Sequence, residues 1–204
     1  MKKISLVLAT AAALAAGGVS AQSFSVRAGI ANFNPQSDTG TIAGANSSID
    51  DSNRFVVGAS YFLDDSWEFA FDTGATTFKH SVSLAGLGNV VSLKHHPINL
   101  GINWHFLGAD SSSGFSPYVG AGYNWTSLSD TNGIGALAGV PIEIDDSSGF
   151  TATLGTDFNI TEQFYLRGEA RYIDFSSAVF AGGANVGTAS VDPWVFTFAG
   201  GYRF

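Results

Sequence analysis

The feature that most constrains this chain is the alternation of large and small side chains in its final stretch, DPWVFTFAGGYRF. A repeat of two residues is the period of a β-strand, whose successive side chains point to opposite faces. In a soluble β-sandwich the second face meets water and carries charged or long polar side chains, yet here it is mostly small. We therefore expect the large face to meet apolar surroundings and the small face to line a tight interior. The large residues are Trp194, Phe196, Phe198, Tyr202 and Phe204.

The same alternation recurs in seven earlier segments, so the sequence predicts eight strands. Three connections are short (DDS, LGADSSSGF and NITE), and four longer ones, 34–53, 79–96, 127–148 and 176–192, are expected to be loops. Short turns at one end, long loops at the other and an even strand number predict an all-β fold, an eight-stranded antiparallel transmembrane β-barrel with short periplasmic turns and long extracellular loops. A soluble exported β-sandwich is the alternative. The expected strands are 24–33, 54–63, 67–75, 97–106, 117–126, 149–158, 163–172 and 192–204.

The first segment, residues 1–21, has the pattern of a secretory signal peptide. Lys2 and Lys3 precede an apolar run, and small residues lead to a cleavage site after Ala21. A membrane-anchoring helix is the alternative, but the apolar run over 4–16 is shorter than the roughly 20 residues that a span needs. We therefore expect residues 22–204 to form the outer-membrane barrel domain.

Composition excludes several classes of function. The chain of 204 residues has no cysteine, which excludes disulfides and thiolate or zinc-thiolate chemistry. It has 17 acidic against 9 basic residues, which argues against nucleic-acid binding, since that needs a basic surface. Charged residues are 13% of the chain, about half the usual globular share, and glycine is abundant at 25 residues. These values are typical of a protein whose outer surface is only partly in water.

Charged side chains on the inward face gather in the half of the barrel nearest the short turns, once the strand directions are assigned. An eight-stranded barrel interior is only just wide enough for side chains, and unpaired charges there are unfavourable. We therefore predict a paired ionic network that plugs the periplasmic half of the lumen. Its members are Arg27, Glu68, Asp72, His105, Asp157, Arg167, Glu169, Arg171 and Arg203.

The other half of the predicted lumen carries few charges. We expect it to form a narrow, less polar space that is open at the extracellular end and closed by the charged plug at the periplasmic end. A wide aqueous pore does not fit this pattern. The expected lining residues are Val56, Gly58, Asn99, Gly120, Thr151, Ile173, Phe175, Val195 and Thr197.

Four stretches, KHHPINLGINWHF, FSPYVGAGYNWT, RYIDFSS and VDPWVFTFAGGYRF, resemble the OmpW family of Gram-negative outer-membrane proteins. The resemblance implies an eight-stranded barrel that passes small hydrophobic molecules across or into the outer membrane of a Gram-negative bacterium. It also implies that Tyr202 and Phe204 form the signal read by the barrel-assembly machinery. The chain departs from the family where relatives have Pro-Pro, here Pro97-Ile98, and where they carry an aromatic residue, here Ser148. An aromatic gate is therefore not carried over to position 148.

Together these features predict a monomeric outer-membrane barrel that passes small hydrophobic molecules through a narrow lumen and releases them sideways into the membrane. Its expected partners are outer-membrane lipid, lipopolysaccharide and the barrel-assembly machinery, with no nucleic acid. We expect no cofactor, no catalytic residues and no dedicated metal site. His95 and His96 are adjacent and therefore point to opposite faces of an extended chain, so the pair is a poor chelate. A weak metal site that includes His80, at the other end of the same connection, is the alternative. We interpret them as the polar base of a loop near the lipid headgroups.

Two other functions remain open at this point. A structural or receptor protein would contact lipopolysaccharide without transport, and divalent cations on the acidic loops would favour it. An outer-membrane enzyme that modifies lipids would need a base beside a nucleophile, and four histidines and many serines are present. Solvated loops that keep the rim in water explain the acidic residues more simply. These residues are Asp38, Asp50, Asp51, Asp130, Glu143, Asp145 and Asp146.

Overall fold

The structure is a computed structural model that describes residues 24–36, 41–42, 44–111 and 114–204. The expected signal peptide, residues 1–21, lies outside the described residues, as does Asp38 of the first long connection. Among the described residues, no helix has the length and apolar character needed to span a bilayer.

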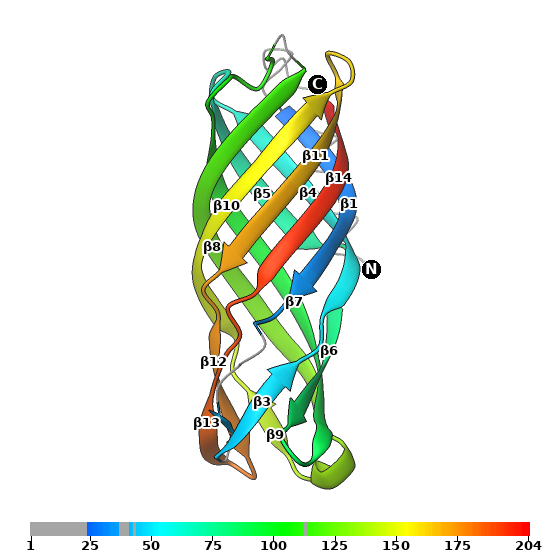
Figure 1. Cartoon of the computed structure of the whole chain (residues 1–204), viewed down its shortest axis with the longest axis vertical. Coiled ribbons are helices and arrows are strands. Elements are labelled where there is room, and N and C mark those ends of the chain that lie inside the picture. The colour runs from blue at the N-terminus through cyan, green and yellow to red at the C-terminus, as the bar shows by residue number, and fades with distance from the viewer. Residues whose placement is uncertain (1–23, 37–40, 43, 112–113) are drawn as a thin grey trace.

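Within the described part of the chain, eight long strands form one closed antiparallel barrel (Figure 1). The strand order is β5-β4-β1-β14-β11-β10-β8-β7, and pairing of β7 with β5 closes the sheet. The eight-stranded barrel predicted from the sequence is confirmed, and the β-sandwich alternative is wrong. The barrel strands are β1 (Phe24–Asn34), β4 (Ser52–Phe62), β5 (Trp67–Gly74), β7 (Gly88–His105), β8 (Phe115–Gly133), β10 (Ser147–Asn159), β11 (Phe164–Ile173) and β14 (Trp194–Arg203).

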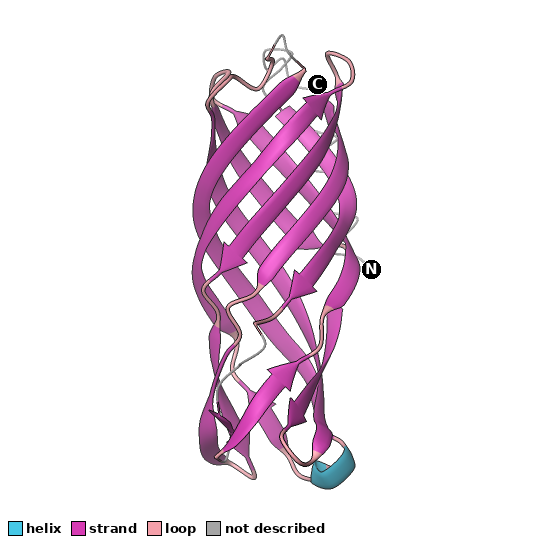
Figure 2. Cartoon of the chain, viewed as in Figure 1, coloured by secondary structure: helices cyan, strands magenta, loops and turns pink. Residues whose placement is uncertain are grey.

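The long connections are not loops but form an extension of β-structure beyond the barrel, at the bottom of Figures 1 and 2. The cause is that the alternation of buried and exposed residues continues past the barrel. In β6, Phe78 and Val82 are buried while Lys79 between them is exposed. The strands β7 and β8 also run on into this extension. Its other elements are β2 (Thr41–Ile42), β3 (Ala45–Ile49), β6 (Phe78–Leu84), a 3₁₀ turn (Gly135–Leu137), β9 (Ile142–Ile144), β12 (Ser176–Ala181) and β13 (Ala184–Ser190).

The outer wall of the barrel is apolar and ends in aromatic residues on both sides. Trp67 and Trp104 pair across β5 and β7 at the end with the short turns, which we call the turn end. Trp125 and Trp194 are exposed at the opposite end of the wall, where the extension begins. Aromatic residues of this kind prefer the two membrane–water interfaces. The wall between them therefore has the character of a surface in contact with lipid.

The interior is tight because tyrosine rings lie directly over glycines of the neighbouring strand. Tyr165 on β11 covers Gly201 on β14, and Tyr118 on β8 covers Gly155 on β10. A Cβ atom at either glycine would overlap the ring above it. The small face of the terminal strand is thus the face that makes room for large side chains inside the barrel.

The two adjacent glycines of β14 offer a direct test of this packing. We expect Gly201→Ala to lower the free energy of unfolding by about 1–3 kcal/mol, since the added methyl group overpacks the lumen against Tyr165. Gly200→Ala is the matched control, because a Cβ there meets no atom within 4 Å. Urea titrations of the refolded barrel, followed by tryptophan fluorescence, measure both. Equal stability of the two variants would contradict the packing.

Candidate functional site

The nine ionisable residues expected to plug the lumen lie together on its inner face, in the half nearest the turn end. Eight of them are buried, and Asp72 is partly exposed. They come from six of the barrel strands: the parity of each position directs its side chain into the lumen, and the register of the strands brings the charges to similar heights. We call this group the ionic network. It consists of Arg27, Glu68, Asp72, His105, Asp157, Arg167, Glu169, Arg171 and Arg203.

Arg167 lies at the centre of the ionic network. Its guanidinium group donates to both carboxylate oxygens of Glu68, at 2.9 and 3.1 Å. It also donates to both oxygens of Asp157, at 2.7 and 2.9 Å. Tyr118 covers one side, with its ring centroid 4.8 Å from the guanidinium carbon. Two bidentate pairs hold this one cation, which is the strongest geometry that arginine and carboxylates form.

Two of these ion pairs cross the full width of the barrel. Strands β11 and β5 stand four places apart in the closed order of eight, and hence on opposite walls. Arg167 reaches Glu68 across this gap, and Arg171 reaches Asp72 at 2.7 Å. The lumen at this height is therefore bridged by side chains from wall to wall.

The remaining charges connect to these bridges. Arg27 donates to Asp72 at 2.9 and 2.5 Å. Arg171 also pairs with Glu169 at 2.6 Å, and Arg203 pairs with Asp157 at 3.0 Å. Every arginine of the ionic network thus contacts at least one of its carboxylates, which satisfies the requirement for pairing in a low-dielectric interior.

Sequence reasoning missed the neutral polar residues that complete the network. The Ser60 hydroxyl hydrogen-bonds to Glu68 and accepts from Arg27. Asn103 donates to Glu68 at 2.9 Å, and the Tyr118 hydroxyl donates to Glu169 at 2.8 Å. The available signal was that these residues have inward parity and lie at the same height as the charges on the same or neighbouring strands. The pattern of charged residues alone does not reveal these neutral members.

A serine, a histidine and a carboxylate lie in line within the network. Nδ1 of His105 is 2.8 Å from the Ser116 hydroxyl, and Nε2 is 3.0 Å from Glu68. This order resembles that of a hydrolase. All three side chains are fully buried, however, and Glu68 is already held by Arg167. No acyl group can reach the serine in this arrangement.

Six of the residues expected to line the other half of the lumen lie at the far edge of the ionic network or beyond it. Two of them mark that edge, because Asn99 pairs with Asp72 and Val195 pairs with Arg171 on the neighbouring strands. Ile173 and Phe175 belong to a buried apolar cluster, and Val56 and Val195 pack against it. Asn99 and Thr151 are buried polar residues nearer the network, and Asn99 accepts a hydrogen bond from Asn124 at 2.9 Å.

The three other expected lining residues require a correction, because they lie at the level of the ionic network. A side chain at Gly58 would meet Asp72 and Arg27. One at Gly120 would meet the Asn103 amide oxygen, which approaches the backbone there. Thr197 stands opposite Glu169 in the pairing of β14 with β11. The network extends further along the barrel than the sequence positions of its charges suggested.

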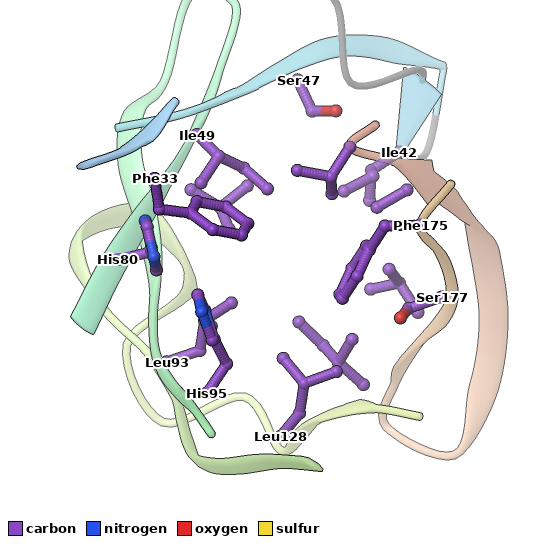
Figure 3. A pocket seen from close by; sticks show the side chains of 15 residues that line it. Phe33, Ile42, Ser47, Ile49, His80, Leu93, His95, Leu128, Phe175 and Ser177 are labelled. Carbon is purple, nitrogen blue, oxygen red and sulfur yellow. The ribbon is translucent and has the colours of Figure 1, made fainter. Parts of the chain in front are cut away.

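Beyond the network, inside the extension, lies a small cavity of about 40 Å³ (Figure 3). Phe33, Ile49, Leu128 and Phe175 contribute to its mainly apolar lining. Two histidines on neighbouring strands, His80 and His95, complete one side of it, and we call it the histidine cavity.

The two imidazole rings of this cavity stack in parallel, with centroids 4.8 Å apart and an angle of 8° between them. Phe78 stacks on the other face of His95 at 4.8 Å. His96 points the other way and meets the Thr73 hydroxyl at 3.1 Å. The prediction that adjacent histidines would diverge is confirmed. Their interpretation as a polar loop base near headgroups is wrong for His80 and His95, which are buried among aromatic rings.

The expected assembly residues lie at the turn end. The ring of Phe204 packs against Phe24 and Tyr202, with centroids 5.8 and 5.1 Å apart. Tyr202 contacts Phe164 on β11 at 5.0 Å. This cluster joins the first and last strands of the barrel to β11. Its role as an assembly signal stays a prediction.

Comparison with known proteins identifies the family of the chain. The sequence model of the OmpW family matches residues 20–204. The chain belongs to the OmpW family. Outer membrane protein W of Vibrio cholerae serotype O1 is 33% identical, and that of Escherichia coli K12 is 29% identical, each over the full length of both chains.

Solved structures agree with this assignment. The crystal structure of the outer membrane protein OprG from Pseudomonas aeruginosa matches with a TM-score of 0.78 and 26% identity, covering 90% of this chain and 96% of that one. The structure of the outer membrane protein AlkL in lipid bilayers matches with a TM-score of 0.66 and 22% identity, covering 92% of each chain, and shows the same fold. This is therefore an outer-membrane protein of Gram-negative type. Its turn end is periplasmic and its extension is extracellular.

Burial lowers the pKa of His80 and lowers that of His95 further. The charge of Arg54 adds to both effects, and the carbonyl of Asp50, 2.7 Å from Nδ1 of His80, opposes it there. The rings are therefore neutral in the folded protein near pH 7. The unfolded chain binds protons below about pH 6.5, so the folded state loses stability as pH falls from there toward the lowered pKa values.

We therefore expect protease resistance of the extracellular extension to decrease between pH 7 and pH 5. The double variant His80→Phe, His95→Phe keeps the ring stack without a titratable group and should lose most of this dependence. His96→Phe is the control and should retain it. Limited proteolysis of the refolded protein at matched protease activity measures the effect. An identical pH profile in wild type and double variant would contradict the assignment.

Proposed function

We propose that this protein carries small hydrophobic molecules from the outside into the outer membrane and releases them sideways through its wall. The observation that carries the proposal is the pair of salt bridges, Arg167–Glu68 and Arg171–Asp72, that spans the lumen from β11 to β5. The family resemblance points to the same cargo class.

The physical basis is the contrast between the two halves of the lumen. An apolar molecule moving to the periplasm would have to separate buried ion pairs, and an unpaired charge left in such a place costs about 3–5 kcal/mol. The extracellular half offers an apolar cluster that includes Phe33, Phe78 and Phe175. For a molecule in that half, the lipid outside the wall is a more favourable destination than the charges below it.

The same proposal includes the protein's surroundings. A monomer contacts lipid with its apolar wall, lipopolysaccharide lies against the extracellular extension, and the periplasmic cluster with Tyr202 and Phe204 is read by the assembly machinery. A surface protein that contacts lipopolysaccharide without transport is the second candidate. On the extension, the exposed side chains of Lys94 and Asp130 form an ion pair of 2.5 Å, which is typical of a solvated rim and favours this second candidate.

Removal of the cross-barrel bridges tests the closed lumen. We expect the double variant Arg167→Ala, Arg171→Ala to raise ion conductance in planar bilayers, since both links from β11 to β5 are lost. Lys94→Ala is the control, because its ion pair lies outside the lumen. The electrophoretic shift of the folded barrel verifies assembly of each variant before recording. Conductance of the assembled double variant equal to that of wild type would contradict a lumen closed by the ionic network.

A further inference from the structure

The histidine cavity collects buried polar atoms that have no hydrogen-bond partner. Five such side-chain atoms occur in the described residues, and three of them, Nε2 of His80, Nε2 of His95 and Oγ of Ser177, belong to residues that line this cavity. Each of the three residues is at most 4% exposed. Buried polar groups in proteins are almost always hydrogen-bonded, so three unpartnered atoms around one cavity point to a group that binds there.

These polar groups face one another across an apolar space. Figure 3 shows both imidazoles on one side of the cavity and Ser177 on the other, beside Phe175. Phe33 packs against both imidazoles, with centroids 5.1 Å from His80 and 4.7 Å from His95. A molecule bound here therefore meets hydrocarbon on most sides and polar atoms at a few points.

The hydrogen-bonding roles of the three groups can be assigned in part. Nδ1 of His80 lies 2.7 Å from the Asp50 carbonyl oxygen, which only accepts, so Nδ1 carries the proton and Nε2 presents a lone pair. The Ser177 hydroxyl both donates and accepts. Burial keeps both imidazoles neutral near pH 7, as their lowered pKa values indicate. The cavity thus offers one fixed acceptor and two groups that can donate or accept, the Ser177 hydroxyl and Nε2 of His95, without a charge.

We propose that the histidine cavity recognises the hydroxyl group of small apolar alcohols and phenols. The hydroxyl donates to Nε2 of His80 and accepts from Ser177 or His95, while the hydrocarbon part lies against Phe33 and Phe175. The inference rests on the proposed function and narrows its cargo class. A volume of about 40 Å³ holds roughly three water-sized groups, so it fits the polar end of such a molecule and not a whole hydrocarbon.

A metal ion is a poorer occupant of this cavity. Among the described residues, no three histidine, cysteine, aspartate or glutamate side chains lie close enough to share an ion. Nδ1 of His80 is also occupied by the Asp50 carbonyl. Ordered water is the remaining rival, and the experiment must separate it from an alcohol.

The test is a titration of the full-length protein in lipid nanodiscs, followed through the ¹⁵N resonances of its imidazoles. The probes are benzyl alcohol, its methyl ether and toluene, which share a benzyl group: the alcohol can donate and accept a hydrogen bond, the ether can only accept, and toluene can do neither. We expect benzyl alcohol to shift the Nε2 resonance of His80 saturably and to bind about tenfold more tightly than toluene, as one or two added hydrogen bonds allow. The ether cannot donate to Nε2 of His80 but can still accept from Ser177 or His95, so it should bind less tightly than the alcohol.

Variants whose side chains point away from the cavity serve as controls. His80→Phe and Ser177→Ala should each reduce the preference for the alcohol. His96→Phe, on β7 next to His95, and Ser176→Ala, on β12 next to Ser177, should leave it unchanged. Loss of preference in the control variants as well would overturn the assignment of the site. Benzyl alcohol that shifts no imidazole resonance would show ordered water alone in the cavity and would also overturn it.

Uptake of the same probes by cells separates this inference from the proposed function. If the protein speeds toluene uptake but shows no preference for the alcohol in the titration, the inference is wrong and the proposed transport is supported. If the titration shows a clear preference for the alcohol but no probe is taken up faster, the binding site is supported and the proposed transport is contradicted.

Discussion

The structure depends on two ion pairs that cross the barrel, Arg167 with Glu68 and Arg171 with Asp72. A closed barrel in lipid must turn its apolar side chains outward and its polar ones inward, so the charges of six strands meet in one narrow space. There each charge needs a partner of opposite sign. The bridges provide partners from opposite walls. In the proposed function they separate the periplasm from the extracellular half of the lumen.

That separation gives the two halves of the protein different chemistry. In the periplasmic half, arginines and carboxylates fill the lumen, and glycines such as Gly155 and Gly201 let tyrosine rings lie flat against the wall. In the extracellular half, the strands continue past the membrane and enclose an apolar cluster with two neutral histidines. A molecule that enters from outside meets hydrocarbon first and charges later. In the proposed route, such a molecule leaves through the wall beside it into lipid.

Much of the barrel and of its charged interior was predictable from the period of two in the sequence. It gave the number of strands, their order of connection and the inward parity of every charge, and parity with strand direction placed Arg27 and Asp157 in the same half. It did not show that β3, β6, β12 and β13 continue the sheet, because these strands are short and each contains serine or other small polar residues that are common in loops. It also placed Gly58 too high, because height in the barrel depends on strand register: Gly58 pairs directly with Arg27 on β1 and with Asp72 on β5. The stack of His80 on His95 depends on the register of β6 against β7, which no single strand reveals.

The central claim is that cargo never passes the ionic network. The most direct measurement is photo-crosslinking of a diazirine-bearing hydrocarbon, supplied from outside to cells that display the protein, with adducts mapped by mass spectrometry. The account predicts adducts on inward residues above the network, such as Phe175, and none on Ser25 or Ser116, which face the lumen at its periplasmic end. Adducts on Ser25 or Ser116 would show that cargo crosses the network and would contradict sideways release.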